Sequence, residues 1–346
     1  MRMINTLKTI SLTTLLVAFF AASAWGTNQM PGKGTVVKPA RATWTTGFFL
    51  EALYSRALDE LGYTVSKARD LSNPIFYQAV TYGDVDFWAN GWFPIHNAQL
   101  PDNFDQHAKI AGYIVKAGAL QGYLASKDEV EKLGIKDLND FKRPEVKEAF
   151  DANGDGKADL VACPPGWGCE KVISHHMKVY DLEDHVNTIQ AGYSAGMADA
   201  VGRARNGQPV FFYTWTPNWT VFTFKPGEDV MWLNVPEIIP SPAQEGLEDV
   251  LVASGVEGAV TDPIKLGFAL NDIVVVANKG FLKNNPPAEK IFEVMSVSLE
   301  DIANQNYRMY QGEDSQRDIE RHVDEWIADN QAKWDSWLEQ ARQAAD

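Results

Sequence analysis

Helical and strand-like patterns alternate along most of this chain, and that alternation limits its fold more than any other feature. Residues Thr46–Tyr63 carry apolar side chains at helical spacing and end beside Gly62, a helix stop signal. Gln208–Trp215 and Asn271–Lys279 have the apolar runs typical of buried strands. Such alternation predicts packed α/β layers, and after residue 285 the pattern is helical throughout.

Two strand-like segments, GYLASK and NDIVVVANK, bracket the middle of the chain. Since 346 residues are more than one hydrophobic core usually holds, we expect two domains. We predict that residues 27–130 and 273–346 form lobe 1 and that residues 131–272 are inserted into it as lobe 2. The two crossovers would act as a hinge, and the cleft between such lobes is a natural ligand site.

Residues 1–26 have the plan of a secretory signal peptide. Arg2 and Lys8 precede an apolar run, and the segment ends in the small residues Ala22–Ala24. The run is too short to span a membrane stably, and no cysteine near the cleavage region could carry a lipid. We therefore expect a periplasmic protein without a membrane anchor.

The chain is strongly acidic, with a formal net charge of -15. Removal of the signal peptide also removes Arg2 and Lys8, which takes the charge from -15 to -17. A protein of this charge repels phosphate backbones and anionic lipids. Nucleic acid and membrane surfaces are therefore excluded as expected partners.

The motifs of common enzyme classes are missing from the sequence. It contains no GxxxxGK[ST], GxSxG or HExxH pattern, and its two cysteines have no partner at zinc spacing. Its six histidines are scattered, and we expect the polar helix pattern around His175, His176 and His185 to expose them to solvent. A hydrolase of choline-like esters would need a nucleophile with a base, and none can be assigned. We therefore expect no enzyme and no catalytic residue.

Three tryptophans differ from the others in their setting. Trp92 lies in NGWFPIHN after the segment Ala79–Asn90, which we expect to be a strand; Trp167 precedes the helical segment EKVISHHMKVY, and Trp215 ends a strand-like segment. Ligands of open α/β sheets bind where such loops gather, at the carboxyl ends of strands. Core packing is the alternative for each ring taken alone. Together, the three indicate an aromatic ligand site.

Polar groups accompany those rings in the sequence. Gly168 and Cys169 begin a predicted helix, so their N–H groups lack intrahelical partners and can bind an anion. Pro94 suits a first helical turn and would place His96 near another helix start, although an ordinary surface histidine is the alternative. Ring faces opposite N–H donors would complement a zwitterion that carries a bulky cation and a carboxylate.

The two cysteines enclose the loop that carries Trp167. Cys163 and Cys169 are close enough in sequence for a small-loop disulfide, which would fix this tryptophan and the neighbouring N–H groups before a ligand binds. Free thiols are the alternative, which an oxidising compartment disfavours.

The segment DANGDGKADL resembles part of a calcium-binding loop. Asp151, Asn153, Asp155 and Asp159 occupy ligand positions of that pattern, but the residue at the last position is Ala162 and not glutamate. A weak structural calcium site is one interpretation, and an Asx-rich turn without metal is the favoured one. We expect no other cofactor.

At these residues the chain resembles the periplasmic glycine betaine-binding proteins of ABC importers. The resemblance rests on PGKGT, SRALDELGYTV, GWFPIH, DANGDGKADL, CPPGWGCE, FFYTWTP and the Trp-rich helical tail. It implies an aromatic box of Trp92, Trp167 and Trp215 for a quaternary ammonium group. It also implies that His96 and the amides of Gly168 and Cys169 hold a carboxylate.

The resemblance further implies an α/β, two-lobed type II periplasmic binding protein fold with an interdomain ligand cleft and a helical C-terminal tail. It implies a disulfide between Cys163 and Cys169, a monomer, and partnership with a permease and its cytoplasmic ATPase. Choline, proline betaine or a sulfonium analogue is an alternative ligand, and an aromatic-rich sugar-binding protein is an alternative function. Trp44 and Trp88 add aromatic rings that the family pattern does not account for.

Overall fold

The computed structural model describes residues 29–345, so the predicted signal peptide lies outside the described residues. Its first long helix, α1 (Thr46–Glu60), buries Phe49, Leu53 and Ala57 on one face, as the helical spacing of its apolar residues predicts. The helix ends just before Gly62, whose left-handed φ of 91° suits a glycine. The predicted helix is therefore confirmed.

We define lobe 1 as the part of the molecule built on the sheet β5-β14-β6, in which β14 pairs antiparallel with both neighbours. Its elements are β1 (Val36–Val37), β2 (Ala40–Ala42), α1, β3 (Thr64–Val65), β4 (Arg69–Leu71), α2 (Asn73–Tyr82), β5 (Phe87–Phe93), the 3₁₀ helix η1 (Ile95–Gln99), α3 (Phe104–His107), β6 (Ala108–Ala119), β14 (Asn271–Asn278), α9 (Lys279–Asn284), α10 (Pro286–Val294), α11 (Leu299–Tyr310), α12 (Gln316–Asp329) and α13 (Gln331–Gln343).

We define lobe 2 as the part built on the sheet β11-β7-β10-β8-β9, in which β10 pairs antiparallel with β7 and parallel with β8. Its elements are β7 (Gln121–Ser126), α4 (Lys127–Leu133), η2 (Leu138–Lys142), α5 (Pro144–Phe150), β8 (Ala158–Val161), α6 (Gly168–Val179), β9 (Val186–Ile189), α7 (Tyr193–Arg205), β10 (Phe211–Trp215), α8 (Thr220–Thr223), β11 (Val230–Leu233), η3 (Pro242–Gln244), η4 (Glu248–Val250), β12 (Val252–Ala253) and β13 (Ile264–Lys265).

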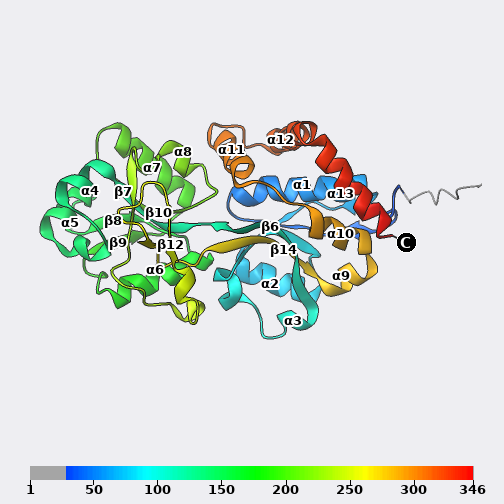
Figure 1. Ribbon diagram of the computed structural model, residues 1–346, viewed down its shortest axis with the longest axis horizontal. Coiled ribbons are helices and arrows are strands. Elements are labelled where there is room, and N and C mark those ends of the chain that lie inside the picture. The colour runs from blue at the N-terminus through cyan, green and yellow to red at the C-terminus, as the bar shows by residue number, and fades with distance from the viewer. Residues whose placement is uncertain (1–28, 346) are drawn as a thin grey trace, which may run out of the picture.

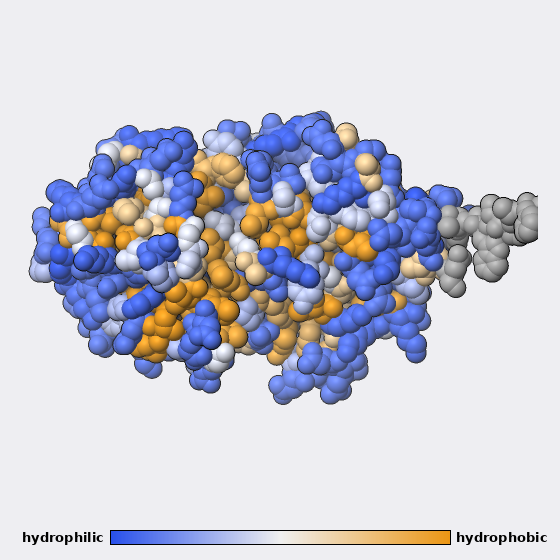
Figure 2. All heavy atoms as spheres, viewed as in Figure 1, coloured by the Kyte–Doolittle hydropathy of each residue, from blue (hydrophilic) through white to orange (hydrophobic). Residues whose placement is uncertain are grey.

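The lobes lie side by side along the long axis of the molecule, and β6 and β14 reach from lobe 1 toward lobe 2 (Figure 1). In Figure 2 the outer ends are mostly hydrophilic, and hydrophobic atoms gather toward the middle, where the lobes meet. The predicted divisions at 130/131 and 272/273 stay predictions. The pairing of β7 within the lobe 2 sheet favours a first crossover between β6 and β7.

The terminal part of the chain is helical, as its pattern predicts. Ser298 and Ser315 are the N-caps that precede α11 and α12, and each side chain accepts a hydrogen bond from the N–H three residues on, at Asp301 and Asp318. These caps satisfy N–H groups that a helix start leaves without partners.

Two local predictions from the sequence are wrong. Ala79–Asn90 is not one strand segment, because α2 continues to Tyr82 and ends at Gly83, whose φ is 77°, before β5 begins. His176 is 1% exposed, not solvated, because it lies on the same face of α6 as the buried Val172 and Ile173. Its Nδ1 lies 2.9 Å from the Tyr123 hydroxyl, and burial lowers its pKa to about 3.

Candidate functional site

A cavity at the boundary between the lobes brings together all the ligand-binding residues predicted from the sequence. Lobe 1 contributes lining residues from the β2–α1 connection, α2, β5 and η1, and lobe 2 contributes them from β7, β10 and the start of α6. The lining consists of Trp44, Asn73, Trp92, Ile95, His96, Gln121, Trp167, Gly168, Cys169, Tyr213 and Trp215. Residues far apart in the chain thus share one site.

Each predicted tryptophan reaches the cavity from the end of a secondary-structure element. Trp92 lies near the end of β5, Trp167 precedes the first residue of α6, and Trp215 is the last residue of β10. Trp92 and Trp215 are buried, whereas Trp167 is half-buried. This placement agrees with the expectation that the three rings gather where strands and helices end.

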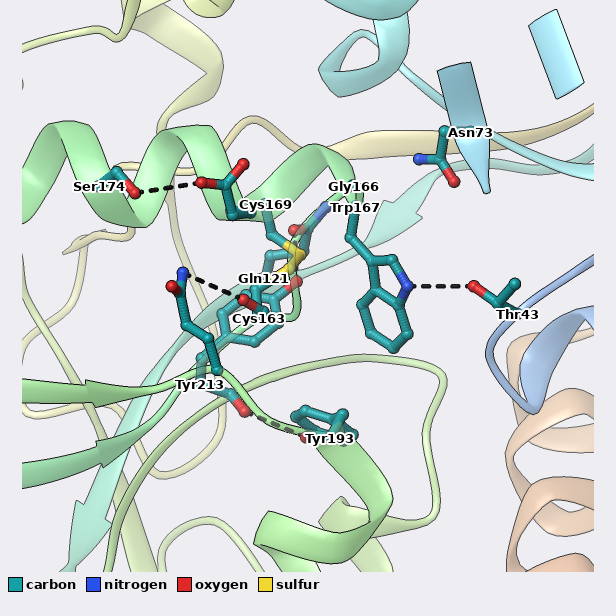
Figure 3. The surroundings of a disulfide bond; sticks show 12 residues. Thr43, Asn73, Gln121, Cys163, Gly166, Trp167, Cys169, Ser174, Tyr193 and Tyr213 are labelled. Carbon is teal, nitrogen blue, oxygen red and sulfur yellow. Dashed lines mark hydrogen bonds between the residues drawn. A yellow bond between two sulfur atoms is a disulfide. The ribbon is translucent and has the colours of Figure 1, made fainter. Parts of the chain in front are cut away.

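The two tryptophan rings from lobe 2 meet at a steep angle and do not stack. The ring centroids of Trp167 and Trp215 are 5.5 Å apart with an angle of 80° between the planes. Figure 3 shows Trp167 pointing away from the disulfide toward Thr43, and its Nε1 donates a hydrogen bond of 3.1 Å to the Thr43 hydroxyl in lobe 1. Rings at such angles can surround a guest with several faces.

His96 is buried at the lobe 1 side of the cavity, in the first turn of η1. The backbone N–H of Trp92 donates to Nδ1 over 3.1 Å, and the Tyr77 hydroxyl lies 2.7 Å from the same atom. Because a backbone N–H can only donate, Nδ1 is an acceptor and the neutral ring carries its proton on Nε2. His96 can therefore donate a hydrogen bond through Nε2.

Burial also fixes the charge of His96. The side chain is 3% exposed, and desolvation lowers its pKa to about 3, so the imidazole is neutral at ordinary pH. Nδ2 of Asn73 lies 2.9 Å from Nε2, and its Oδ1 has no hydrogen-bond partner among the described residues. Because Nδ2 is a donor and Nε2 carries the ring proton, these two groups do not satisfy each other. This end of the cavity therefore holds polar groups that the described residues do not fully satisfy.

The start of α6 faces His96 across the lobe boundary. Gly168 and Cys169 are its first two residues, whose N–H groups lie where a helix offers no intrahelical acceptor. A Cβ built on Gly168 would lie 3.1 Å from Cδ2 of His96, so glycine at this position allows the lobes to approach closely. The positive end of the helix dipole points at the same place.

A disulfide between Cys163 and Cys169 closes the loop that holds Trp167, with the two Cα atoms 5.9 Å apart. The predicted disulfide is therefore confirmed. Within the loop, Gly166 has a φ of 89° and its carbonyl accepts from Gln99 of lobe 1 at 3.4 Å. The disulfide thus fixes the end of α6 that faces the other lobe.

Five lining residues were outside the predicted site. Tyr213 lies two residues before Trp215 on β10, and alternation along a strand puts both on one face, which the sequence could have shown. The sequence gives no comparable signal for the others, because tertiary packing alone brings them to the cavity. They are Trp44, Asn73, Ile95 and Gln121.

The acidic segment around Asp151 forms an Asx-rich turn away from this cavity. Asp151 accepts from the N–H groups of Gly154, Asp155 and Gly156, which lowers the pKa of its carboxyl. Asp159 accepts from the backbone N–H of Ala152. Within residues 29–345, no cluster of three or more His, Cys, Asp or Glu is placed to hold a metal ion. These hydrogen bonds have the form of an Asx-rich turn, and the calcium site at Asp151, Asn153, Asp155 and Asp159 stays a prediction.

None of the helices within residues 29–345 combines the length and the apolar composition that a membrane span requires. The fold itself has a solved counterpart: the structure of lactococcal OpuAC, closed around glycine betaine, is 18% identical with a TM-score of 0.66, covering 88% of this chain and 99% of that one. The protein therefore has the two-lobed type II periplasmic binding protein fold, as predicted.

Sequence comparison is more specific. Residues 35–329 match the substrate binding domain of ABC-type glycine betaine transport systems. The glycine betaine-binding periplasmic protein OusX of Dickeya dadantii is 41% identical over 340 residues, which cover 98% of each chain. The glycine betaine/proline betaine-binding periplasmic protein of Salmonella typhimurium is 37% identical over 333 residues, which cover 96% of this chain and 98% of that one. The chain belongs to the family of substrate-binding domains of ABC-type glycine betaine transport systems.

Proposed function

We propose that this protein captures glycine betaine, or a closely related quaternary ammonium zwitterion, in the periplasm. It then presents the ligand to an ABC importer, which consists of a membrane permease and a cytoplasmic ATPase. The relatives named above are periplasmic binding proteins, and the family serves ABC-type transport. In this proposal residues 1–26 direct export and are removed, and the mature protein works as a monomer without catalysis.

The observation that carries the proposal is the division of the cavity into an aromatic part and a hydrogen-bonding part. Trp92, Trp167 and Trp215 supply electron-rich ring faces that attract a desolvated trimethylammonium group. With His96 neutral, none of the described lining residues carries a formal charge. A ligand without net charge, whose two opposite charges are separated by one carbon, fits such a lining.

The carboxylate would occupy the end of the cavity where N–H donors meet. Nε2–H of His96 would donate from lobe 1, and the amides of Gly168 and Cys169 would donate from lobe 2. Charge-assisted hydrogen bonds of this kind are stronger than neutral ones, and the helix dipole adds to them. Because the donors come from both lobes, the ligand would stabilise the closed arrangement.

The alternatives differ in what they ask of the cavity. Choline keeps the cation but lacks the carboxylate, so the donors of His96, Gly168 and Cys169 would lose their acceptor. A sulfonium analogue of betaine keeps both charges and is the harder ligand to distinguish. A sugar needs many side-chain hydrogen bonds, yet the Tyr213 hydroxyl already donates to Oε1 of Gln121 over 2.6 Å. A hydrolase needs a nucleophile with a base, and none can be assigned from the sequence.

Calorimetric titration of the purified protein tests the proposal directly. The ligands are glycine betaine, choline, a neutral sugar and 3,3-dimethylbutanoate, in which a tert-butyl group replaces the trimethylammonium group. If cation–π attraction contributes up to ~2 kcal/mol per ring, the tert-butyl compound binds at least two orders of magnitude more weakly than glycine betaine. Equal affinity for these two ligands, or tighter binding of the sugar, would contradict the proposal.

A single variant separates the two halves of the cavity. His96→Ala removes a carboxylate donor and leaves the tryptophans in place, so we expect it to weaken glycine betaine at least tenfold and choline by less than twofold. A loss that is equal for both ligands would mean that His96 supports the structure and does not bind the carboxylate.

A further inference from the structure

Trp44 is a tryptophan of the cavity that the predicted aromatic box does not include. It lies in the connection between β2 and α1, and its side chain is 7% exposed and lines the cavity together with Trp92, Trp167 and Trp215. An aromatic ring on the wall of a small cavity is within reach of whatever occupies it. Its position therefore calls for a functional account as well as a structural one.

Trp88 holds Trp44 in place from inside lobe 1. The two ring centroids are 5.6 Å apart with an angle of 63° between the planes. Trp88 is fully buried and packs in turn against Phe76, with centroids 4.2 Å apart. Trp88 is not among the lining residues of the cavity, so it supports the wall without being part of it.

On its other side, Trp44 meets the groups assigned to the ligand. Its centroid is 5.3 Å from that of Trp167 in lobe 2, at an angle of 61°, and 6.2 Å from the His96 ring. Trp44 thus lies between the carboxylate end and the aromatic end of the cavity. A rigid indole in this place reduces the space available around the cation.

We propose that Trp44 is a fourth aromatic wall of the box, which contacts the ligand and restricts the site to compact quaternary ammonium groups. This inference rests on the proposed function and adds to it the size of cation that the site accepts. The ring of Trp44 attracts the cation. Because Trp88 packs behind it, Trp44 cannot move aside for a larger cation without disturbing a packed core. Bulkier N-alkyl groups are therefore excluded by shape.

The test compares glycine betaine with its triethyl analogue, N,N,N-triethylglycine, by calorimetry. We expect the native protein to bind glycine betaine at least 100-fold more tightly than the triethyl compound, because each additional methylene group meets a closed wall. Trp44→Leu opens that wall, so it weakens glycine betaine at least tenfold and reduces the 100-fold preference to tenfold or less. Trp44→Phe, a smaller change, reduces the preference at least threefold and serves if the leucine variant fails to fold.

Trp88→Phe is the matched control, because it alters the same aromatic cluster behind the cavity wall. If Trp44 had a purely structural role, the Trp44 variants and Trp88→Phe would each weaken the binding of both ligands by the same factor. The inference is overturned if the Trp44 variants leave the ratio of the two affinities within twofold of the native value, or if Trp88→Phe reduces it equally. A native protein that binds neither ligand overturns the proposed function itself, which is a distinct result.

Discussion

The two lobes meet in two aromatic regions whose ring geometry differs. At the cavity, the rings of Trp44, Trp167 and Trp215 meet at 61° and 80°. Outside it, Trp219 of lobe 2 lies on Tyr310 of α11 with ring centroids 3.9 Å apart and planes only 6° from parallel. Stacked rings cover each other's faces, whereas steeply angled rings leave faces free to meet a guest.

Buried polar groups do not separate the two regions. Oδ1 of Asn73 at the cavity and Oδ1 of Asn218, next to Trp219, are both buried without a hydrogen-bond partner in the described part of the chain. The Thr46 hydroxyl lies between the regions: it accepts from Nε1 of the cavity ring Trp215 over 3.4 Å and lies 3.3 Å from the carbonyl of Pro217. What distinguishes the cavity is therefore the arrangement of its rings, and tryptophan content alone does not mark a binding site.

The largest effect that we expect comes from removing a cavity ring. Trp167→Ala should weaken glycine betaine about 30-fold or more, since one desolvated cation–π contact contributes about 2 kcal/mol. The tert-butyl isostere, 3,3-dimethylbutanoate, should lose far less affinity, because it has no cationic group for the ring to attract. Calorimetry of both ligands with the native and variant proteins checks this. Equal losses would mean that the ring acts through apolar burial alone.

The disulfide belongs to the cavity region, because it closes the loop that holds Trp167. The Cys163→Ser, Cys169→Ser double variant should weaken glycine betaine about tenfold, since it frees the loop that positions Trp167 and the start of α6. The closed loop is short, so the loss of folding stability should be only about 2–3 kcal/mol, and the protein stays folded. Thermal unfolding and calorimetry on the same sample separate the two effects. Unchanged affinity would mean that the disulfide does not position the binding site.

The stacked pair should behave in the opposite way from the cavity rings. Tyr310→Ala removes a contact of the closed arrangement, so every ligand should lose the same factor, about threefold to tenfold, whatever its charge. Tyr310→Phe keeps the ring and is the control, with affinities within twofold of native. A larger loss of affinity for glycine betaine than for its tert-butyl isostere would contradict the distinction between the two regions.

The smallest effect on affinity should come from pH. Burial lowers the pKa of His96 and His176 to about 3, below the ordinary value of 6.5 in the unfolded chain. The neutral His96 therefore keeps its Nε2–H donor, and affinity should change less than twofold between pH 8 and pH 5. Stability should fall over the same range, because only the unfolded state takes up protons below pH 6.5.

His96 and His176 should each cost about 2 kcal/mol of stability at pH 5 and almost nothing above about pH 7.5. Denaturant unfolding across this range measures the slope, and His176→Gln should make it shallower without affecting the ligand. A marked fall in affinity at pH 5 would mean that His96 becomes protonated in the folded protein.

Much of the fold followed from local patterns, since α1 and the strands β10 and β14 have the spacing and composition of their types. The expectation that His176 is exposed is wrong, because this polar side chain lies on the apolar face of α6 and is buried there. The six proposed ligand-binding residues could be named from loop context and family resemblance. Asn73 and Gln121 could not, since what places them in the cavity is contact between lobes and not their neighbours in sequence.

The indole rings at the cavity and behind its wall have an optical consequence. Trp88, Trp44, Trp167 and Trp215 form a continuous series with successive centroid distances of 5.6, 5.3 and 5.5 Å, and the middle step crosses from lobe 1 to lobe 2. Chromophores this close share their electronic excitation, so the series gives the protein a near-ultraviolet circular dichroism signal that depends on the lobes being together. Opening of the lobes would interrupt the series at its middle step, and the protein would thereby report its own conformation without a label.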